Sequence, residues 1–224
     1  TGGFQTTRAG ASDAVVTKLN PSLSAVLWSS YLGGTGNESG YSLQLSAQGD
    51  VYVAGGTTSN NFPRTAGGLL TAAPGGGADG FVARIGATGN QLLQSTYLGT
   101  ASYDQAYFLQ LGPQPQGNVY VLGQTLGAYP TTAGVYANAG SRQFIHQLSP
   151  TLNATIFSTV IGNGSGGVSG VPNISPTAFL VDNCGQLLLS GWGAANVAGQ
   201  VLGEAVGHGH GAASQQQFHR HRAA

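Results

Sequence analysis

The stretch GDVYVAG at residues 49–55 decides the fold, because two further versions of it follow in the chain. The second version is GNVYVLG at 117–123, and the third is GQLLLSG at 185–191. Each version is a short β-prone run that begins after one glycine and ends at another, which is typical of a strand entered from a tight turn. Repetition of such a unit indicates a repeat protein.

Other motifs recur in the same order around this stretch. SDAVVTKL at 12–19 returns as ADGFVARI at 78–85 and, more loosely, as SRQFIHQL at 141–148. SYLGG at 30–34 returns as TYLGT at 96–100 and TVIG at 159–162, and NFPRTAG at 61–67 returns as AYPTTAG at 128–134. The positions that recur, and for which we expect structural roles, are Asp13 and Asp79, Tyr31 and Tyr97, Gly33 and Gly99, Gly49, Gly117 and Gly185, Tyr52 and Tyr120, and Pro63 and Pro130.

Each copy predicts about four strands and no helix. Residues 41–46 alternate large apolar with small polar side chains, the period of a half-buried strand. Residues 51–53 follow after a short glycine-containing connection, which predicts a hairpin. Two further β-prone runs precede them, at 14–19 and 25–32. The sequence therefore predicts an all-β fold.

Four short antiparallel strands per copy are typical of a β-propeller blade. We expect blade-like repeats at 1–72, 73–139 and, incomplete, at 140–193, with the stub of a preceding blade at 1–7. Three copies leave an open wedge, so this interpretation predicts an incomplete propeller and further blades of the same longer chain as partners. A linear β-solenoid is the alternative, although its rungs are usually shorter.

The composition excludes some classes of function. Only 14 of 224 residues are charged, 7 of each sign, whereas 38 are glycine. A net charge of zero gives no support for electrostatic capture of nucleic acid or of an anionic membrane. No apolar run reaches the length of a membrane span, so no membrane insertion is expected.

The repeat resembles the bacterial β-propeller repeat known as SBBP. The residues that carry the resemblance are Asp13–Asn20, Trp28–Gly40 and Gly49–Thr65, and it extends over about 1–193. Segments 179–185 and 190–193 are similar to a variant blade in large secreted bacterial proteins, which often carry a sorting domain linked to gliding motility. The resemblance implies a secreted or cell-surface scaffold or adhesion module, with a surface protein or polysaccharide as partner. It carries no catalytic residues and no cofactor.

The tail at 194–224 departs from the repeat. It is rich in Ala, Gly, Gln and His, and we expect it to be disordered. It is interpreted either as a genuine low-complexity end or as a reading frame lost in mid-blade. Four of the five histidines lie here, and the pairs His208 with His210 and His219 with His221 are weak metal-binding candidates.

The glycine-rich loops suggest calcium and phosphate as two further ligand types. Asp13, Asp79, Asn37, Glu38 and Asp104 lie in or beside such loops, where calcium finds oxygen ligands, but they are isolated and a structural role is preferred. The glycine clusters at 33–36 and 75–77 lack the Lys-Ser/Thr of a phosphate-binding loop, so they are predicted to be turns.

The remaining candidates are predicted to be structural as well. His146 replaces Thr17 and Ala83 of the other copies and is interpreted as an ordinary strand residue. Cys184, the only cysteine, is expected to be a small half-buried residue near a turn. Five recurring aromatic residues could form a sugar-stacking platform, but packing within the blade is preferred for them: Trp28, Tyr31, Tyr52, Tyr97 and Tyr120.

Three functions remain open from the sequence. A non-enzymatic surface scaffold is favoured. The alternative is a glycan-binding propeller, which needs aromatic side chains exposed at one rim. An enzyme acting on polysaccharides needs converging acids, and Asp and Glu are scarce.

Overall fold

The computed structural model describes residues 2–164 and 174–193, and in this part the chain is all-β, as expected, with no helix. The predicted tail at 194–224, with its four histidines, lies outside the described residues. The strands are β1 (Ala14–Leu19), β2 (Val26–Leu32), β3 (Glu38–Leu45), β4 (Val51–Thr57), β5 (Asp79–Ile85), β6 (Leu92–Leu98), β7 (Asp104–Leu111), β8 (Val119–Thr125), β9 (Gln143–Leu148), β10 (Thr155–Ile161), β11 (Ile174–Val181) and β12 (Leu187–Gly193).

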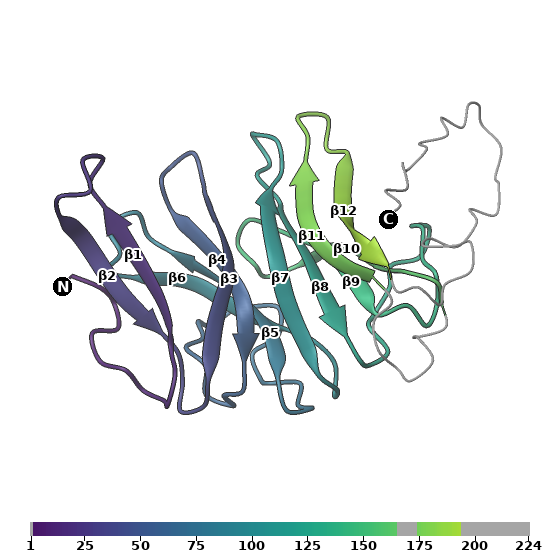
Figure 1. Cartoon of the computed structure of the whole chain (residues 1–224), viewed down its shortest axis with the longest axis horizontal. Helices are drawn as coiled ribbons and strands as arrows, with labels where there is room; N and C mark the ends of the chain where they lie inside the picture. Colours follow the sequence, from purple (N-terminus) through teal and green to yellow (C-terminus); the bar gives the residue numbers. More distant parts are fainter. Residues whose placement is uncertain (1, 165–173, 194–224) are drawn as a thin grey trace, which may run out of the picture.

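The strands form four antiparallel sheets that follow one another in chain order (Figure 1). Sheets β3-β4-β5-β6 and β7-β8-β9-β10 have four strands each, and β1-β2 and β11-β12 have two each. Within each sheet, strands that follow one another in sequence are paired, so the connections are local. Within the described residues no sheet closes on itself.

A glycine with positive φ precedes each of β4, β8 and β12, and the turns before β4 and β12 share one hydrogen-bond pattern. Gly49, Gly117 and Gly185 have φ of 84°, 57° and 78°, which side-chain-bearing residues rarely adopt. The amide of Gly49 donates to the carbonyl of Ser46 at 2.9 Å, and that of Gly185 to Asp182 at 3.0 Å. These three recurring glycines therefore set the hairpins that the sequence predicted.

The sheets are out of phase with the sequence copies. Each four-stranded sheet takes two strands from one copy and two from the next, so residues 38–57 pair with residues 79–98. The expected boundaries near residues 72 and 139 fall in loops inside a sheet. The period of a repeat is the same wherever counting starts, so sequence alone did not fix where a sheet begins.

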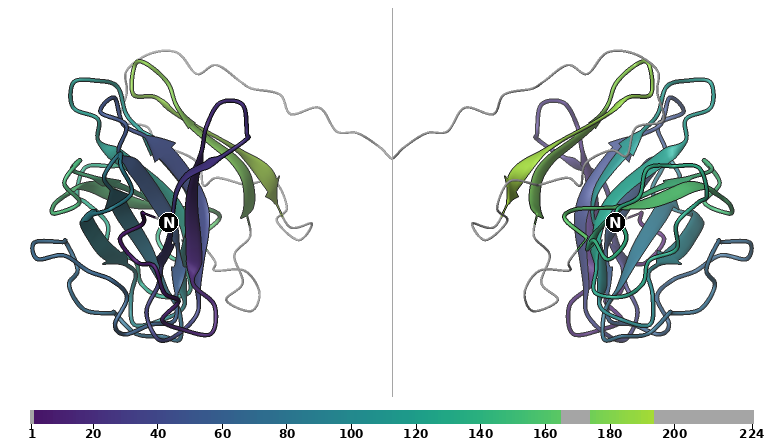
Figure 2. Two further views of the ribbon diagram at one scale, coloured as in Figure 1. Left: turned by 90° about the vertical axis from the view of Figure 1, so that its left-hand side faces the viewer. Right: turned by 90° about the vertical axis from the view of Figure 1, so that its right-hand side faces the viewer.

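The core lies within and between successive sheets. Strand β7 packs on β3, β4 and β5 of the preceding sheet, and β11 packs on β7 (Figure 1). Figure 2 looks along the stack, and the sheets lie behind one another in it. Between the two large sheets, Tyr52, Val82, Leu98, Leu109 and Val121 are buried in one cluster. Stacking of this kind buries the two faces of a central sheet against different neighbours.

The recurring tyrosine and proline positions serve this packing. Tyr97 is 1% exposed, and its hydroxyl donates to the carbonyl of Ser59 at 2.9 Å. Pro63 and Pro130 lie in loops, where their carbonyls accept hydroxyl hydrogen bonds from Ser95 at 2.7 Å and Ser158 at 2.6 Å. The same loop is therefore tied to the last strand of the sheet in both copies.

Candidate functional site

A pocket of about 430 Å³ lies where the first strands of three successive sheets meet. Strand β3 contributes Tyr41, β7 contributes Tyr107 and Phe108, and β8 contributes Gln124. The other wall is the start of β11, residues 174–176. The pocket is the strongest candidate binding site because aromatic and polar groups from separate sheets converge on it.

A β-bulge brings the two tyrosines into this pocket. Gly40 pairs with Gly55 and Ser42 with Ala54, so Tyr41 between them has no partner on β4. The same irregularity leaves Tyr107 without a partner on β8. A bulge bends its strand and redirects a side chain. The two rings lie 5.5 Å apart between centroids, tilted by 48°.

The pKa values of the Tyr103 and Tyr107 hydroxyls are raised, so these two groups stay neutral. Burial, the main cause, together with the neighbouring hydroxyls of Tyr103 and Tyr41, raises the pKa of Tyr107 to about 12. Burial also raises the pKa of Tyr103, which shares a hydrogen bond with Tyr107. Tyr41 keeps 45% of its surface exposed. The pocket therefore offers an accessible aromatic face and neutral hydroxyl and amide groups.

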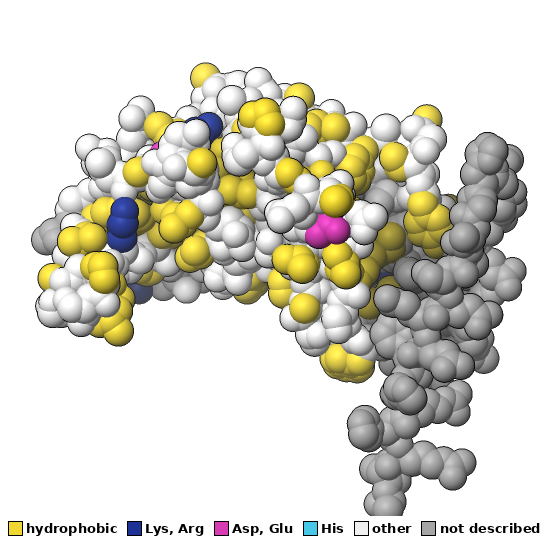
Figure 3. Space-filling view, turned by 90° about the horizontal axis from the view of Figure 1, so that it is seen from above, with side chains coloured by type: hydrophobic (Ala, Val, Ile, Leu, Met, Phe, Trp, Pro, Cys, Tyr) yellow, Lys and Arg dark blue, Asp and Glu magenta, His cyan; other side chains and the backbone are white. Residues whose placement is uncertain are grey.

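None of the described residues that line the pocket carries a charged side chain. The face of the molecule in Figure 3 likewise shows few acidic or basic groups among its described residues. An uncharged lining with aromatic faces, the Gln124 amide and the Ser175 hydroxyl favours a neutral polyhydroxylated ligand over an anion or a metal ion.

Glu38 and Asp13, two of the calcium candidates, already accept hydrogen bonds from groups of the protein. Glu38 is 2% exposed and accepts hydrogen bonds from the amide of Gly34 at 2.9 Å and the hydroxyls of Thr57 and Ser59 at 2.6 and 2.5 Å. Asp13 accepts the amides of residues 9 and 10. These carboxylates accept hydrogen bonds from loop amides. The GGTG loop at 33–36 therefore has an acceptor within the protein and needs no bound phosphate.

Asp79 and Asp104 lie at the equivalent positions of the next copy, and their carboxylate oxygens have fewer hydrogen-bond partners. Asp104 accepts the amide and hydroxyl of Thr100 at 2.6 and 2.9 Å, and burial raises its pKa. Asp79 is 5% exposed, with the Gly75 amide 3.4 Å from Oδ2 and no hydrogen-bond partner for Oδ1 among the described residues. Burial raises the pKa of Asp79 to about 6, and the charge of Asp104 adds to this. Arg142 takes the place of Asp79 in the third copy.

His146 is a core residue of β9. Its Nδ1 lies 2.8 Å from the hydroxyl of Tyr129 and its Nε2 lies 2.8 Å from the hydroxyl of Thr155. Burial lowers the pKa of His146 to about 4. Both ring nitrogens are engaged with neutral hydroxyls, which fits the expected structural role.

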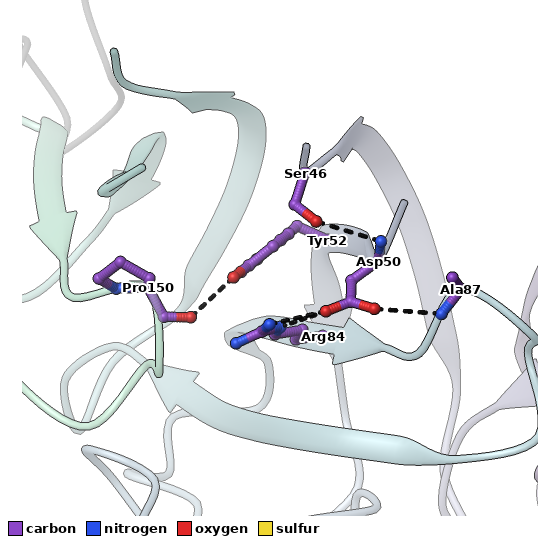
Figure 4. Close-up of polar contacts among 6 residues, drawn as sticks. All are labelled: Ser46, Asp50, Tyr52, Arg84, Ala87 and Pro150. Atoms are coloured by element: carbon purple, nitrogen blue, oxygen red, sulfur yellow. Dashed lines mark hydrogen bonds and ion pairs between the residues drawn. The ribbon is translucent and has the colours of Figure 1, made fainter. Parts of the chain in front are cut away.

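The most developed polar cluster joins the two large sheets (Figure 4). Asp50 receives the guanidinium of Arg84 on Oδ2 and the amide of Ala87, at 3.1 Å, on Oδ1. Tyr52 lies two residues after Asp50, in β4, and its hydroxyl donates to the carbonyl of Pro150 at 2.8 Å, in the loop between β9 and β10. All these groups already have partners within the chain, so the cluster is structural.

Packing in the core, which was preferred over a sugar-stacking platform for the recurring aromatic residues, is what the structure shows for most of them. Four of these side chains are buried in the core, and Tyr31 is half-buried. The buried ones, 7% exposed or less, are Trp28, Tyr52, Tyr97 and Tyr120. The pocket uses Tyr41 and Tyr107 instead. Both copies have a tyrosine at this place of the repeat, and that recurrence is the signal in the sequence by which the pair could be found.

The other candidates lie apart from the pocket. Cys184 is exposed in the turn between β11 and β12, so the expectation of a half-buried residue was wrong. Among the described residues no group of three or more His, Cys, Asp or Glu side chains is placed to hold a metal ion. The same residues include no helix able to span a membrane. The metal candidates His208, His210, His219 and His221 lie outside the described residues.

Comparison with known proteins gave no match to a protein-family model and none to a curated protein.

Proposed function

We propose that this chain is a segment of a β-propeller and serves as a non-enzymatic binding scaffold. The observation that carries the proposal is the regular stacking of the sheets. The same four-stranded unit occurs twice in succession, each with a bulge at the same place in its first strand. Stacked four-stranded antiparallel sheets of this kind are the units of propellers.

The polar chemistry of the chain supports a binding role over catalysis. Glu38, Asp13 and Asp50 have their oxygens bonded to groups of the fold, and His146 is enclosed between two hydroxyls. A general acid or base needs reach to a substrate proton. Incubation with a broad panel of polysaccharides should give no turnover, and product formation would remove the non-enzymatic assignment.

The proposal places the module outside the cell, as the resemblance to the SBBP repeat implies. Its 224 residues carry only 14 charges with a net charge of zero, so electrostatic capture of nucleic acid or of an anionic membrane has no support. Protease treatment of intact cells should cleave the protein, while a cytoplasmic marker stays whole. Survival of the protein in that assay would contradict the location.

A second function is favoured by the pocket. The tilted pair Tyr41 and Tyr107, with Gln124 beside it, suits a neutral sugar whose apolar face packs on an aromatic ring. Binding of a glycan-array hit, measured by calorimetry, should weaken about tenfold or more in Tyr41→Ala. The matched control is Leu45→Ala, which removes a 61% exposed side chain of the same strand that does not line the pocket. Equal weakening by both variants would reject the pocket as the site.

A further inference from the structure

The third copy of the repeat replaces a buried tyrosine by a much smaller residue. Val160 in β10 stands where Tyr97 stands in β6, and each lies opposite a phenylalanine of the neighbouring strand, Phe144 and Phe81. In the second copy the phenol of Tyr97 is buried and its hydroxyl reaches the loop that follows β4. In the third copy a pocket of about 590 Å³, the Val160 pocket, is lined by Val160 and by the loop that follows β8.

The Tyr97 hydroxyl of the second copy serves two backbone groups of that loop. It donates to the carbonyl of Ser59 at 2.9 Å and accepts the amide of Phe62 at 3.0 Å. The equivalent groups of the third copy are the carbonyl of Gly127 and the amide of Tyr129, and both residues line the Val160 pocket. The valine that replaces the tyrosine has no polar side-chain atom for either group.

Arg142 supplies the donor that the tyrosine hydroxyl provides in the second copy, but it supplies no acceptor. Its Nη1 donates to the carbonyls of Leu126 at 2.6 Å and Gly127 at 3.3 Å. A guanidinium carries donors only. Among the described residues the amide of Tyr129 has no acceptor, and the Nε of Arg142 is buried without a partner. The donors of the third copy therefore lack the acceptor that the second copy has.

The charge at this position is reversed between the copies. Asp13 and Asp79 stand in the first two copies where Arg142 stands in the third. Among the described residues that line the Val160 pocket, only Arg142 is charged. The described part of the chain holds one ion pair, between Arg84 and Asp50, so Arg142 has no acidic partner there. An anion could therefore approach Arg142 without competing with a carboxylate of the fold.

The rest of the wall is apolar and held in place. The lining residues with apolar side chains or rings are Leu126, Ala128, Tyr129, Ala137, Ala139 and Val160. Loop 137–141 is tied to β10, because Asn138 donates its amide to the carbonyl of Val160 at 3.0 Å and its Nδ2 to that of Gly162 at 2.7 Å. The ring of Tyr129 stacks on Phe144 with 4.0 Å between centroids. An apolar wall with one cation suits an organic acid better than an inorganic anion, because the apolar body of the acid also leaves water on binding.

We propose that the Val160 pocket binds a small carboxylate whose body is a single six-membered ring. The ring takes the place that the phenol of Tyr97 has in the second copy. The carboxylate accepts hydrogen bonds from the amide of Tyr129 and from Arg142, and so supplies the missing acceptor. The Val160 pocket shares no lining residue with the pocket of Tyr41 and Tyr107, so this binding site is separate from the glycan site proposed above.

Benzoate is the probe, titrated into the whole nitrogen-labelled 224-residue chain and followed by NMR. The signals of the Tyr129 amide and of the Arg142 Nε–H should shift and saturate at millimolar benzoate, because both groups lie at the proposed carboxylate position. Benzamide has the same shape and no charge, and it should bind about tenfold or more weakly. Equal binding of the two compounds, or no saturable shift at the Tyr129 amide, would overturn the proposal.

Arg142→Gln tests the contribution of the charge. It should weaken benzoate binding about tenfold or more, because a neutral amide replaces the guanidinium. The matched control is Arg64→Gln. Arg64 is an exposed arginine that also donates to a loop carbonyl, that of Thr71, and it does not line the Val160 pocket. This control should bind benzoate as the unchanged chain does, and equal weakening by both variants would reduce the effect to net charge and reject the site.

Val160→Tyr tests the space. It restores the tyrosine of the second copy, whose hydroxyl accepts the amide of the loop there, so it should abolish benzoate binding and raise the thermal unfolding midpoint. A folded Val160→Tyr variant that still binds benzoate would overturn the proposal. If this variant does not fold, the benzamide comparison and Arg142→Gln still decide the matter. None of these measurements involves a residue of the Tyr41 pocket, so the two proposals fail separately.

Discussion

Two nitrogens of the Arg84 guanidinium, Nε and Nη2, converge on a single oxygen of Asp50, Oδ2, at 3.0 and 2.6 Å. Neither side chain is fully exposed, at 23% for Arg84 and 12% for Asp50. The pair fixes the turn before β4 to strand β5, while the ring of Tyr52 lies 5.5 Å from the guanidinium carbon. In the next copy Asn118 and Gln147 occupy these two positions, so the geometry has a neutral counterpart.

Asp50→Ala should therefore lower the free energy of unfolding by about 1–3 kcal/mol, because it leaves the partly buried Arg84 and the amide of Ala87 without their acceptor. Urea denaturation provides the measurement. The double variant Asp50→Asn with Arg84→Gln reproduces the neutral pair of the second copy and should recover part of the loss. A double variant less stable than the single one would show that the ion pair is not what holds this turn.

Asp79 should make the protein less stable as the pH rises. Its pKa is raised from 3.8 to about 6 in the folded state, so between these values the folded protein holds a proton that the unfolded chain has released. The free energy of unfolding therefore falls as the pH rises from 3.8 to about 6, and the whole loss is present above that pH. Asp79→Asn should flatten this slope and add up to about 3 kcal/mol at pH 8.

The control for this prediction is Asp13→Asn at the equivalent position. Asp13 already accepts amides on both oxygens, so loss of its charge should give no gain in stability. Equal stabilisation by both substitutions in thermal unfolding at pH 8 would point to a general charge effect.

His146 should have the opposite effect on the pH dependence of stability, making the protein less stable as the pH falls. Its pKa is lowered from 6.5 to about 4, so between these values the unfolded chain binds a proton that the folded protein excludes. Stability should therefore fall as the pH drops from about 6.5 to 4. In a nitrogen-detected NMR titration, the His146 imidazole should stay neutral at pH 5.5, and a protonated signal there would contradict its burial between Tyr129 and Thr155.

Gly55 should be intolerant of any side chain. An added Cβ would meet the backbone oxygen of Ser39 and lie 2.6 Å from the ring of Phe81. Gly55→Ala should cost several kcal/mol, about 3 or more, because strand pairing and a core ring would both have to move. Gly40→Ala is the control: its nearest contact would be 3.4 Å, at a side-chain carbon of Val53. Similar thermal unfolding midpoints for the two variants would show that the close approach at Gly55 is not limiting.

Much of the local structure could be predicted from the sequence. Runs 14–19 and 51–53 lie in strands, and the recurring glycines make the turns that were expected of them. The pocket could not be predicted in the same way. Tyr41 and Tyr107 follow the strand pattern in the sequence, and only the bulge redirects them toward β11.

By itself, the sequence determined the strands, their hairpin turns and their repetition, because pleat period and turn chemistry act over a few neighbouring residues. Only the tertiary structure decided which copies of a motif are buried. Val15 and Phe81 occupy the same place in the repeat, yet one is 58% exposed and the other is fully buried. The difference lies in the neighbouring strands, since Phe81 has β4 beside it and Val15 has no such strand among the described residues. Burial depends on what packs against a strand, and that is a property of the assembled sheets.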